Sequence, residues 1–227
     1  MTFLGIETST AVCSVGLANE LNVQAEKSII ETHIHSEKLL TLIQELCDEQ
    51  KIKLSQLDGI AVSIGPGSFT GLRIGLSTVK GLCYALEKPL IAVPTFISIA
   101  KSVTMSHPES ARIVVCIDAK QREYYIGVYE HRNGTVGEEL AVHIGSLSSV
   151  LAGASRHTAI VTDSIGEVNA ESGSSLLVED VRSYCRGDVI ASLAVRMRNL
   201  WNMNHWEQLE PMYLKDFVVR TQVKLEK

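Results

Sequence analysis

The sequence lacks long apolar runs and any excess of basic residues. It contains no run of about 18 apolar residues, so we expect no membrane-spanning helix. No basic segment opens the chain and Glu7 interrupts the first apolar run, so we expect no secretory signal peptide. The net charge of −5 provides no overall positive field that would attract nucleic acid or an anionic membrane.

Cysteines are few and widely spaced. Their number is odd, no two form a C-x-x-C pair, and most lie among apolar residues: Cys13, Cys47, Cys83, Cys116 and Cys185. This pattern argues against a disulfide framework and against a zinc site. It predicts reduced, buried thiols in a cytoplasmic protein. The composition of the 227 residues, 45% hydrophobic and 21% charged, is that of an ordinary globular protein.

The glycine-rich stretch at residues 65–75, GPGSFTGLRIG, matches no common catalytic motif. A phosphate-binding loop has four residues between its glycines and then a lysine, whereas five separate Gly65 from Gly71 and a leucine follows. A dinucleotide fingerprint fails at Thr70, and a peptidase elbow, G-x-S-x-G, fails around Ser68. Backbone N–H groups could still hold an anion there. We therefore favour chain geometry and close packing as the reason for the glycines.

Around this stretch we expect a strand over residues 58–64, a tight loop and a helix over residues 71–86. Ser68 or Thr70 would cap the helix. The loop residues are Gly65, Pro66, Gly67, Ser68, Thr70 and Gly71. The helix is apolar or small on more than one side, which is typical of a helix that is central in its domain or covered by a partner. A second helix with a wide apolar face is expected over residues 36–49.

Two segments share one pattern, which indicates an internal duplication. The segment LGIE ends at Glu7 and is followed nine residues later by Gly16; the segment VCID ends at Asp118 and is followed nine residues later by Gly127. Each begins a strand–turn–strand–turn–strand unit, and a helix and a further strand follow. We therefore predict an α/β, two-lobed fold of the actin, Hsp70 and sugar-kinase superfamily, a ribonuclease H-like duplication with a reduced second lobe.

The boundary between the lobes is expected where the chain becomes polar and turn-rich, at residues 104–111. This places the N-terminal lobe at residues 1–104 and the second lobe, with a C-terminal extension, at residues 105–227. Near the end, the apolar pattern of residues 189–203 predicts another helix.

Several segments resemble the bacterial TsaB (YeaZ) family in order and spacing. They are residues 5–10 (GIETST), 35–40 (HSEKLL), 65–75, 117–119 (IDA) with 124–125 (YY), and 211–214 (PMYL). The resemblance spans nearly the whole chain, and the central loop and helix are its most specific part. It implies a cytoplasmic protein required to form threonylcarbamoyladenosine at position 37 of tRNAs that read codons beginning with A.

The resemblance also implies partners and a non-catalytic role. Members of that family bind the catalytic, metal- and ATP-using paralogue TsaD, form the transferase complex with the ATPase TsaE, and are often homodimeric when alone. They are regarded as platforms without catalysis of their own. The resemblance thus implies that this chain is not an enzyme and has no cofactor. Nucleotide would bind weakly, at most at an interface, and tRNA would be met indirectly, through another subunit.

The two expected helices, residues 36–49 and 71–86, carry more apolar surface than one domain face needs. We expect them to pack side by side and to meet the equivalent helices of a homologous partner. The expected interface residues are Leu39, Leu40, Ile43, Leu72, Ile74, Gly75 and Thr78. A bulky residue in place of Gly75 is expected to abolish pairing while the fold stays intact.

A small-molecule kinase or ATPase is the alternative. Glu7 and Asp118 stand where kinases of the superfamily place carboxylates that handle Mg²⁺. Together with Thr8 and Ser9 they form a candidate degenerate nucleotide and Mg²⁺ site. No recognisable glycine-rich adenosine motif follows in the second half, so we expect weak nucleotide binding at most.

Histidines give no metal site. The paralogue holds its metal with two histidines four apart on a helix, and no pair among the 7 histidines here has that spacing. His33 and His35 are two apart and are expected in a solvated turn. The sequence leaves open the partner stoichiometry, any direct contact with tRNA and the role of the C-terminal tail.

Overall fold

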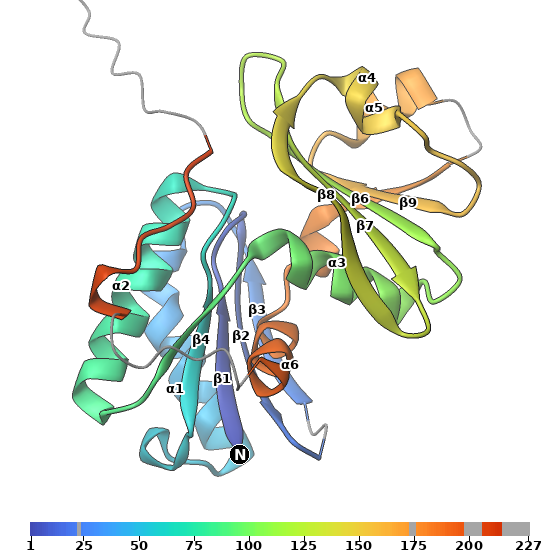
Figure 1. Ribbon diagram of the computed structural model, residues 1–227. Coiled ribbons are helices and arrows are strands. Elements are labelled where there is room, and N and C mark those ends of the chain that lie inside the picture. Colours follow the sequence, from blue (N-terminus) through green and yellow to red (C-terminus); the bar gives the residue numbers. More distant parts are fainter. Residues whose placement is uncertain (22–23, 173–175, 198–205, 215–227) are drawn as a thin grey trace, which may run out of the picture.

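The chain folds into two lobes, each built on a five-stranded sheet (Figure 1). This computed structural model describes residues 1–21, 24–172, 176–197 and 206–214. The last part of the helix predicted at residues 189–203 and the polar tail after residue 214 lie outside the described residues. No helix in the described part of the chain is long and apolar enough to cross a membrane.

The first sheet has the strand order β3-β2-β1-β4-β5, with β2 antiparallel to β1 and β3 and with β4 parallel to β1 and β5. The strands are β1 (Thr2–Glu7), β2 (Val12–Asn19), β3 (Gln24–Ile30), β4 (Gly59–Ser63) and β5 (Leu90–Val93). Helices α1 (His35–Gln50) and α2 (Phe69–Leu86) lie side by side on one face, and the short η1 (Leu54–Gln56) precedes β4. Their apolar stripes pack on the sheet as the 3.6-residue pattern predicts.

The second sheet has the order β10-β9-β6-β7-β8, which is the order of the first sheet with each strand replaced by its counterpart. Its strands are β6 (Arg112–Asp118), β7 (Tyr124–Arg132), β8 (Thr135–Gly145), β9 (Thr158–Thr162) and β10 (Leu177–Asp180). Helices α4 (Leu147–Leu151) and α5 (Ile165–Ser172) cover one face. The shared order confirms the predicted two-lobed α/β duplication. The sequence pattern did not predict α5 or β10.

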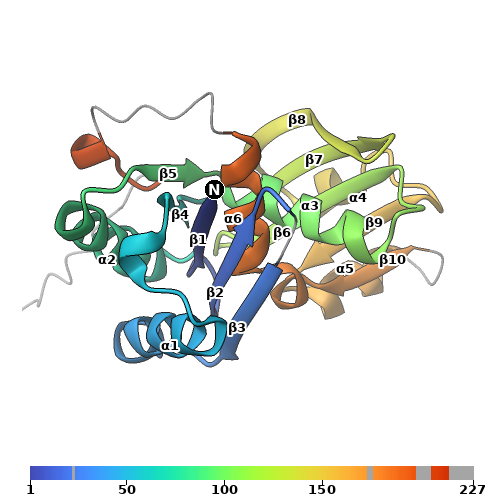
Figure 2. The same cartoon turned by 90° about the horizontal axis from the view of Figure 1, so that it is seen from below.

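The remaining helices are exchanged between the lobes. Helix α3 (Thr95–Ser106) follows the first sheet in the chain but packs Phe96, Ile99 and Val103 against the second sheet. Helix α6 (Gly187–Arg196) follows the second sheet but packs Ile190, Ala191 and Ala194 against the first. Figure 2 shows α6 on the face of the first sheet opposite to α1 and α2. The predicted boundary between residues 104 and 105 therefore places α6 in the second lobe, although α6 packs against the sheet of the first lobe.

Helix α6 approaches the first sheet backbone to backbone. A Cβ atom on Gly5 would lie 2.1 Å from the carbonyl oxygen of Gly187, and one on Gly16 would lie 2.0 Å from the backbone nitrogen of Asp188. The backbone N–H of Gly187 donates to Ser14 Oγ at 2.8 Å. The two strand glycines are thus required because no side chain fits beneath α6.

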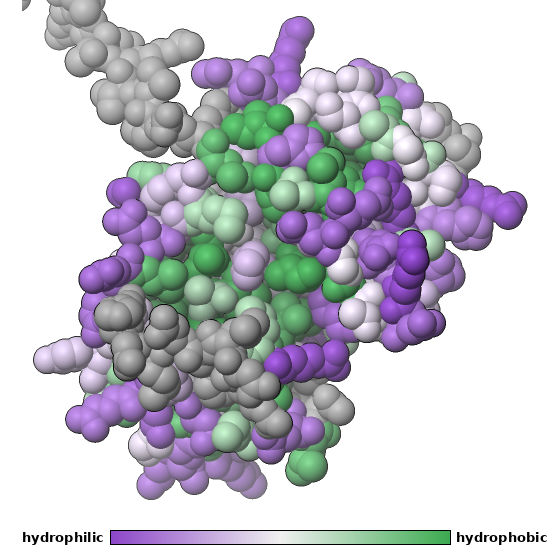
Figure 3. Space-filling model, in the orientation of Figure 1, coloured by the Kyte–Doolittle hydropathy of each residue, from purple (hydrophilic) through white to green (hydrophobic). Residues whose placement is uncertain are grey.

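Most hydrophobic residues are buried between the sheets and the helices that cover them. On the face seen in Figure 3, hydrophobic residues gather toward the middle of the molecule and on the second lobe, whereas hydrophilic residues dominate the outer edges. All five cysteines are buried free thiols, as the sequence predicted. Two features of the described residues are candidate functional sites: a cleft between the lobes and the outer surface of α1 and α2.

Candidate functional site

The glycine-rich loop turns the chain sharply from β4 into α2. Gly65 has φ +114°, a conformation that favours glycine, and Ser68 caps the helix by accepting a hydrogen bond from the backbone N–H of Gly71 at 3.2 Å. This confirms Ser68 as the cap. The helix starts at Phe69, two residues earlier than predicted.

The other glycines of the motif make room for the loop between β1 and β2. A Cβ atom on Gly67 would lie 2.3 Å from the carbonyl oxygen of Ser9, and one on Gly71 would lie 2.1 Å from that of Thr8. A Cβ atom on Gly75 would lie 2.2 Å from Thr8 Oγ1. The close packing expected of these glycines is therefore internal to the first lobe. This corrects the prediction for Gly75, because a bulky residue there would disturb the fold itself.

Four of the residues expected at a partner interface lie inside the first lobe. Leu39, Ile43 and Leu72 are at most 2% exposed, and Gly75 is buried against Thr8. They cannot form a surface for a partner, so the prediction is wrong for them. Part of the apolar surface of the two helices packs inside the first lobe. Helical periodicity alone cannot distinguish a face that packs inside the lobe from a face that is exposed to a partner. Leu40, Ile74 and Thr78 remain accessible.

Among the exposed residues of this helix pair, several are apolar or small. We call five of them the open face: Leu40 of α1 with Ser77, Gly81, Tyr84 and Ala85 of α2, all exposed. Leu40 is 60% exposed and Tyr84 is 79% exposed. No atom of the described residues lies within 4 Å of a Cβ atom placed on Gly81, apart from the helix itself and its chain neighbours. The sequence indicates Gly81 as a small residue on an outer side of the helix, but Gly81 is not among the expected interface residues.

A cleft of about 830 Å³ separates the two lobes. The first lobe lines it with the loop after β1, the start of α1 and the start of α2; the second lobe contributes the ends of β6 and β9 and the short helix η2 (Val181–Tyr184). Polar residues on its walls include Ser9, Thr10, Ser68, Asp118 and Arg182. Of the four candidate nucleotide-site residues, Ser9 and Asp118 therefore line the cleft, whereas Glu7 and Thr8 do not.

Glu7 is not placed to bind Mg²⁺ in the cleft. Its side chain is fully buried, and Oε1 accepts a hydrogen bond from the backbone N–H of Ser9 at 2.5 Å. Glu7 Oε2 and Thr8 Oγ1 have no hydrogen-bond partner among the described residues. Burial raises the pKa of the Glu7 carboxyl, so the fold favours its neutral form. A carboxyl that is fully buried and outside the cleft lining does not reach a cation held in the cleft.

Asp118 is engaged by a cation of the chain itself. Its Oδ2 pairs with Lys120 Nζ at 2.7 Å, and its Oδ1 accepts a hydrogen bond from the backbone N–H of Lys120 at 2.7 Å. Within the described residues, no group of three or more His, Cys, Asp and Glu side chains could hold a metal ion. Of the two carboxylates predicted to handle Mg²⁺, Asp118 lines the cleft and Glu7 does not, so the predicted pair does not come together there.

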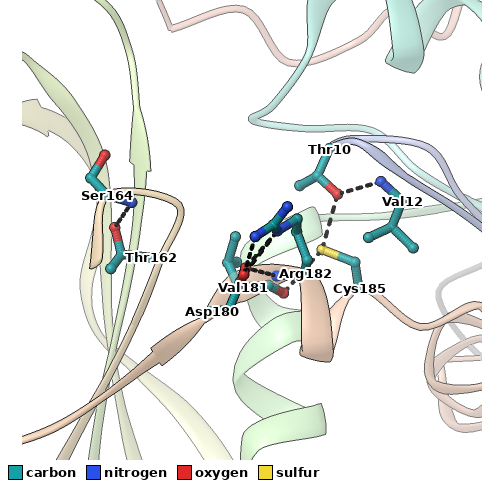
Figure 4. Close-up of polar contacts among 8 residues, drawn as sticks. All are labelled: Thr10, Val12, Thr162, Ser164, Asp180, Val181, Arg182 and Cys185. Carbon is teal, nitrogen blue, oxygen red and sulfur yellow. Dashed lines mark hydrogen bonds and ion pairs between the residues drawn. The ribbon is translucent and has the colours of Figure 1, made fainter. Parts of the chain in front are cut away.

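One wall of the cleft is fixed by hydrogen bonds, shown in Figure 4. Thr10 Oγ1 donates to Cys185 Sγ at 3.4 Å and accepts from the backbone N–H of Val12 at 3.2 Å, which ties the first lobe to the segment that leads into α6. Arg182 donates to the Asp180 carboxylate and lowers its pKa. Burial raises the pKa of the Cys185 thiol well above its ordinary value, so this thiol is not an activated nucleophile.

The two histidines near the cleft differ from the prediction. His33 is exposed in a turn with φ +64°, as expected. His35 is the first residue of α1 and is buried, with Nε2 3.1 Å from the carbonyl oxygen of Val12. The prediction of a solvated turn is therefore wrong for His35, because a hydrogen bond to β2 draws the ring into the core.

Glu7→Gln is expected to change how stability depends on pH. The folded state raises the pKa of Glu7 above its ordinary value of 4.5, so the wild-type fold loses stability as pH rises from 4.5 through the folded pKa. The loss is up to about 1.4 kcal/mol per pH unit within this window, and it is absent below pH 4.5. Glutamine has no proton to lose. Urea unfolding of both forms at pH 4 to 8 should show the variant gaining relative stability with pH.

An exposed carboxyl provides the control for this measurement. Glu171 lies on the surface of α5, and Glu171→Gln should follow the wild-type pH profile. Parallel profiles for wild type and Glu7→Gln would show that folding does not raise the pKa of the Glu7 carboxyl.

Comparisons with known proteins agree with this arrangement. A family model for TsaD, tRNA N6-adenosine threonylcarbamoyltransferase, matches residues 28–168, more than half of the chain. The tRNA threonylcarbamoyladenosine biosynthesis protein TsaB of Escherichia coli (strain K12) is 32% identical over 141 residues, which cover 61% of this chain and 60% of that protein. The chain thus matches less than two thirds of the length of that relative.

Two solved structures share the fold. YeaZ from Pseudomonas aeruginosa superposes with a TM-score of 0.80 at 27% identity, over 93% of this chain and 100% of that chain. The activator of the 2-hydroxyisocaproyl-CoA dehydratase from Clostridium difficile, solved with bound ADPNP, has a TM-score of 0.50 at 9% identity and covers 94% of this chain and 100% of its own. The second likeness concerns the fold alone.

Proposed function

Because this chain belongs to the TsaB (YeaZ) family, we propose that it takes part in forming threonylcarbamoyladenosine at position 37 of tRNAs that read codons beginning with A. It acts in the cytoplasm as a non-catalytic subunit. It binds the catalytic paralogue TsaD and, with the ATPase TsaE, forms the transferase complex; alone, it pairs with a second copy of itself. It has no cofactor of its own, and tRNA is held mainly by other subunits.

The open face is the observation that carries this proposal. A glycine in a helix interior costs about 1 kcal/mol relative to alanine. At positions 71 and 75 the packing of the first lobe requires a glycine, because Thr8 occupies the space that a side chain would need. At Gly81 no neighbour within the described chain occupies the space of a side chain, so internal packing does not require a glycine there. A glycine there allows the backbone of another helix to come close, and the exposed Leu40 and Tyr84 are the apolar anchors that we assign to the same docking surface.

The state of the carboxylates supports the non-catalytic role. A kinase or ATPase of the superfamily would use both carboxylates in the cleft, whereas Glu7 is fully buried outside the cleft lining and Asp118, which lines the cleft, is paired with Lys120. No specific observation favours the kinase alternative.

Reconstitution of the modification tests the proposal. The paralogue TsaD, TsaE and substrate tRNA from the same organism are incubated with ATP and an activated threonylcarbamoyl donor, with and without this chain, and modified nucleoside is quantified by mass spectrometry. We expect formation to fall to background without the chain and to be restored by both wild type and Glu7→Gln. Full formation without the chain would contradict the proposal, and restoration by wild type but not by Glu7→Gln would favour the kinase alternative.

A further inference from the structure

The C-terminal segment Trp206–Leu214, which we call the strap, lies along α2 (Figure 1). It begins with the short helix η4 (Trp206–Gln208), and Trp206 and Leu209 pack against the core of the first lobe. Lys80 Nζ donates to the carbonyl oxygen of Glu207 at 2.7 Å. The strap thus follows α2 from its middle toward its N-terminal end.

At the start of α2 the strap completes a stacked cluster. The guanidinium of Arg73 lies 3.9 Å from the ring centre of Phe69 and 5.8 Å from that of Tyr213. The rings of Phe69 and Tyr213 are 5.1 Å apart, and Arg73 Nε donates to Tyr213 Oη at 2.9 Å. Cation–π stacking and a hydrogen bond therefore join the first turns of α2 to the strap.

The strap also holds the glycine-rich loop. The backbone N–H of Met212 donates to the carbonyl oxygen of Ile64 at 2.6 Å. The carbonyl oxygen of Met212 lies 2.9 Å from the place of a Cβ atom on Gly65, so a side chain at Gly65 would push the strap away. The loop beyond, at Gly67 and Ser68, forms part of the cleft wall. The backbone of Met212 therefore holds the start of the loop between β4 and α2 in place.

Few contacts hold the strap on the first lobe. None of its nine residues is buried, and Met212 and Tyr213 are 36% and 42% exposed. It is retained by a few surface hydrogen bonds, one stacked cluster and the packing of two side chains, Trp206 and Leu209, on the core. Segments with few buried contacts open at a small fraction of the cost of global unfolding. The strap can therefore leave α2 while the lobe stays folded.

We propose that the strap is a releasable brace for the open face: when engaged, it fixes the first turns of α2 and the loop before it in the position that a partner recognises. Its contacts go to Ile64, Phe69, Arg73 and Lys80, none of which belongs to the open face. Strap and partner can therefore occupy α2 at the same time. Release of the strap lowers partner affinity by loosening α2. This role in docking rests on the proposed function, whereas the bracing of α2 does not.

Hydrogen–deuterium exchange of the full-length chain tests the brace. Tyr213→Ala removes the ring and the hydroxyl, and Tyr213→Phe keeps the ring. We expect exchange at residues 64–73 to be about tenfold faster in Tyr213→Ala and intermediate in Tyr213→Phe, with an unchanged global unfolding midpoint. Leu140→Ala, at an exposed site on β8, should exchange like wild type. Unchanged exchange in Tyr213→Ala would overturn the brace.

Titration of the same variants with the TsaD paralogue tests the coupling to docking. Tyr213→Ala should bind about three- to tenfold more weakly, and Leu140→Ala should bind like wild type. Faster exchange with undiminished affinity would overturn the coupling. If wild type itself failed to bind the paralogue, the proposed function would fall, and the exchange result alone would decide whether the strap braces α2.

Discussion

Gly16→Ala is expected to destabilise the chain by more than about 4 kcal/mol, or to prevent folding. The added methyl group would lie 2.0 Å from the backbone nitrogen and 2.4 Å from the Cα atom of Asp188. These are backbone atoms, so no side-chain rotation relieves the clash. Helix α6 cannot move away either, because Gly5 and Ser14 also contact the backbone of Gly187. Urea unfolding followed by circular dichroism measures the effect.

Gly166→Ala is the matched control for this prediction. Gly166 lies exposed in α5, and no atom of the described residues is within 4 Å of its Cβ position beyond its helix and chain neighbours. Alanine there should leave stability unchanged or raise it by up to about 1 kcal/mol. Equal stability of Gly16→Ala and wild type would show that α6 does not pack on the first sheet in solution.

Gly81→Leu is expected to abolish partner binding while it stabilises the isolated chain. Leucine favours a helix over glycine by up to about 1 kcal/mol, and the Cβ position at Gly81 is open. In a complex, the same side chain would separate the two helices and expose Leu40 and Tyr84 to water. We expect the affinity for the paralogue to fall by roughly 100-fold or more, equivalent to about 2.7 kcal/mol. Thermal unfolding and sedimentation velocity measure the two effects.

Two further variants test whether the size of the side chain or its position on α2 weakens partner binding. Gly81→Ala adds one methyl group at the same site and should weaken binding less than leucine does. Gly166→Leu places the same side chain on an exposed helix of the second lobe and should bind like wild type. Undiminished binding by Gly81→Leu would move the docking surface away from α2.

The duplicated fold could be predicted because its signals are local. The acidic residue that ends β1 recurs at the end of β6, and the glycine nine residues later recurs in β7. Strand alternation and turn residues then fix two similar units, and the identical strand order of the sheets follows from them. The cap at Ser68 was also predictable, since it depends only on residues within one helical turn.

Long-range packing could not be predicted. An apolar stripe shows that α3 and α6 are covered on one side, but it does not show which sheet covers them, and they exchange lobes. The same limit applies to glycines: Gly75 and Gly81 look alike in the sequence, yet Thr8 fills the space beside only one of them. The sequence marked residues 211–214 as a landmark, but it could not show where they pack, because Tyr213 stacks on Phe69, which is distant in the chain.

Hydroxyl-radical footprinting of the complex between this chain and the TsaD paralogue is the most direct test of the docking surface. Leu40 and Tyr84 are exposed on the open face, while Met105 and Leu140 are exposed elsewhere and serve as internal references. We predict that the partner protects Leu40 and Tyr84 from oxidation and leaves Met105 and Leu140 as reactive as in the free chain. Protection of Met105 and Leu140, with Leu40 and Tyr84 unchanged, would contradict the account.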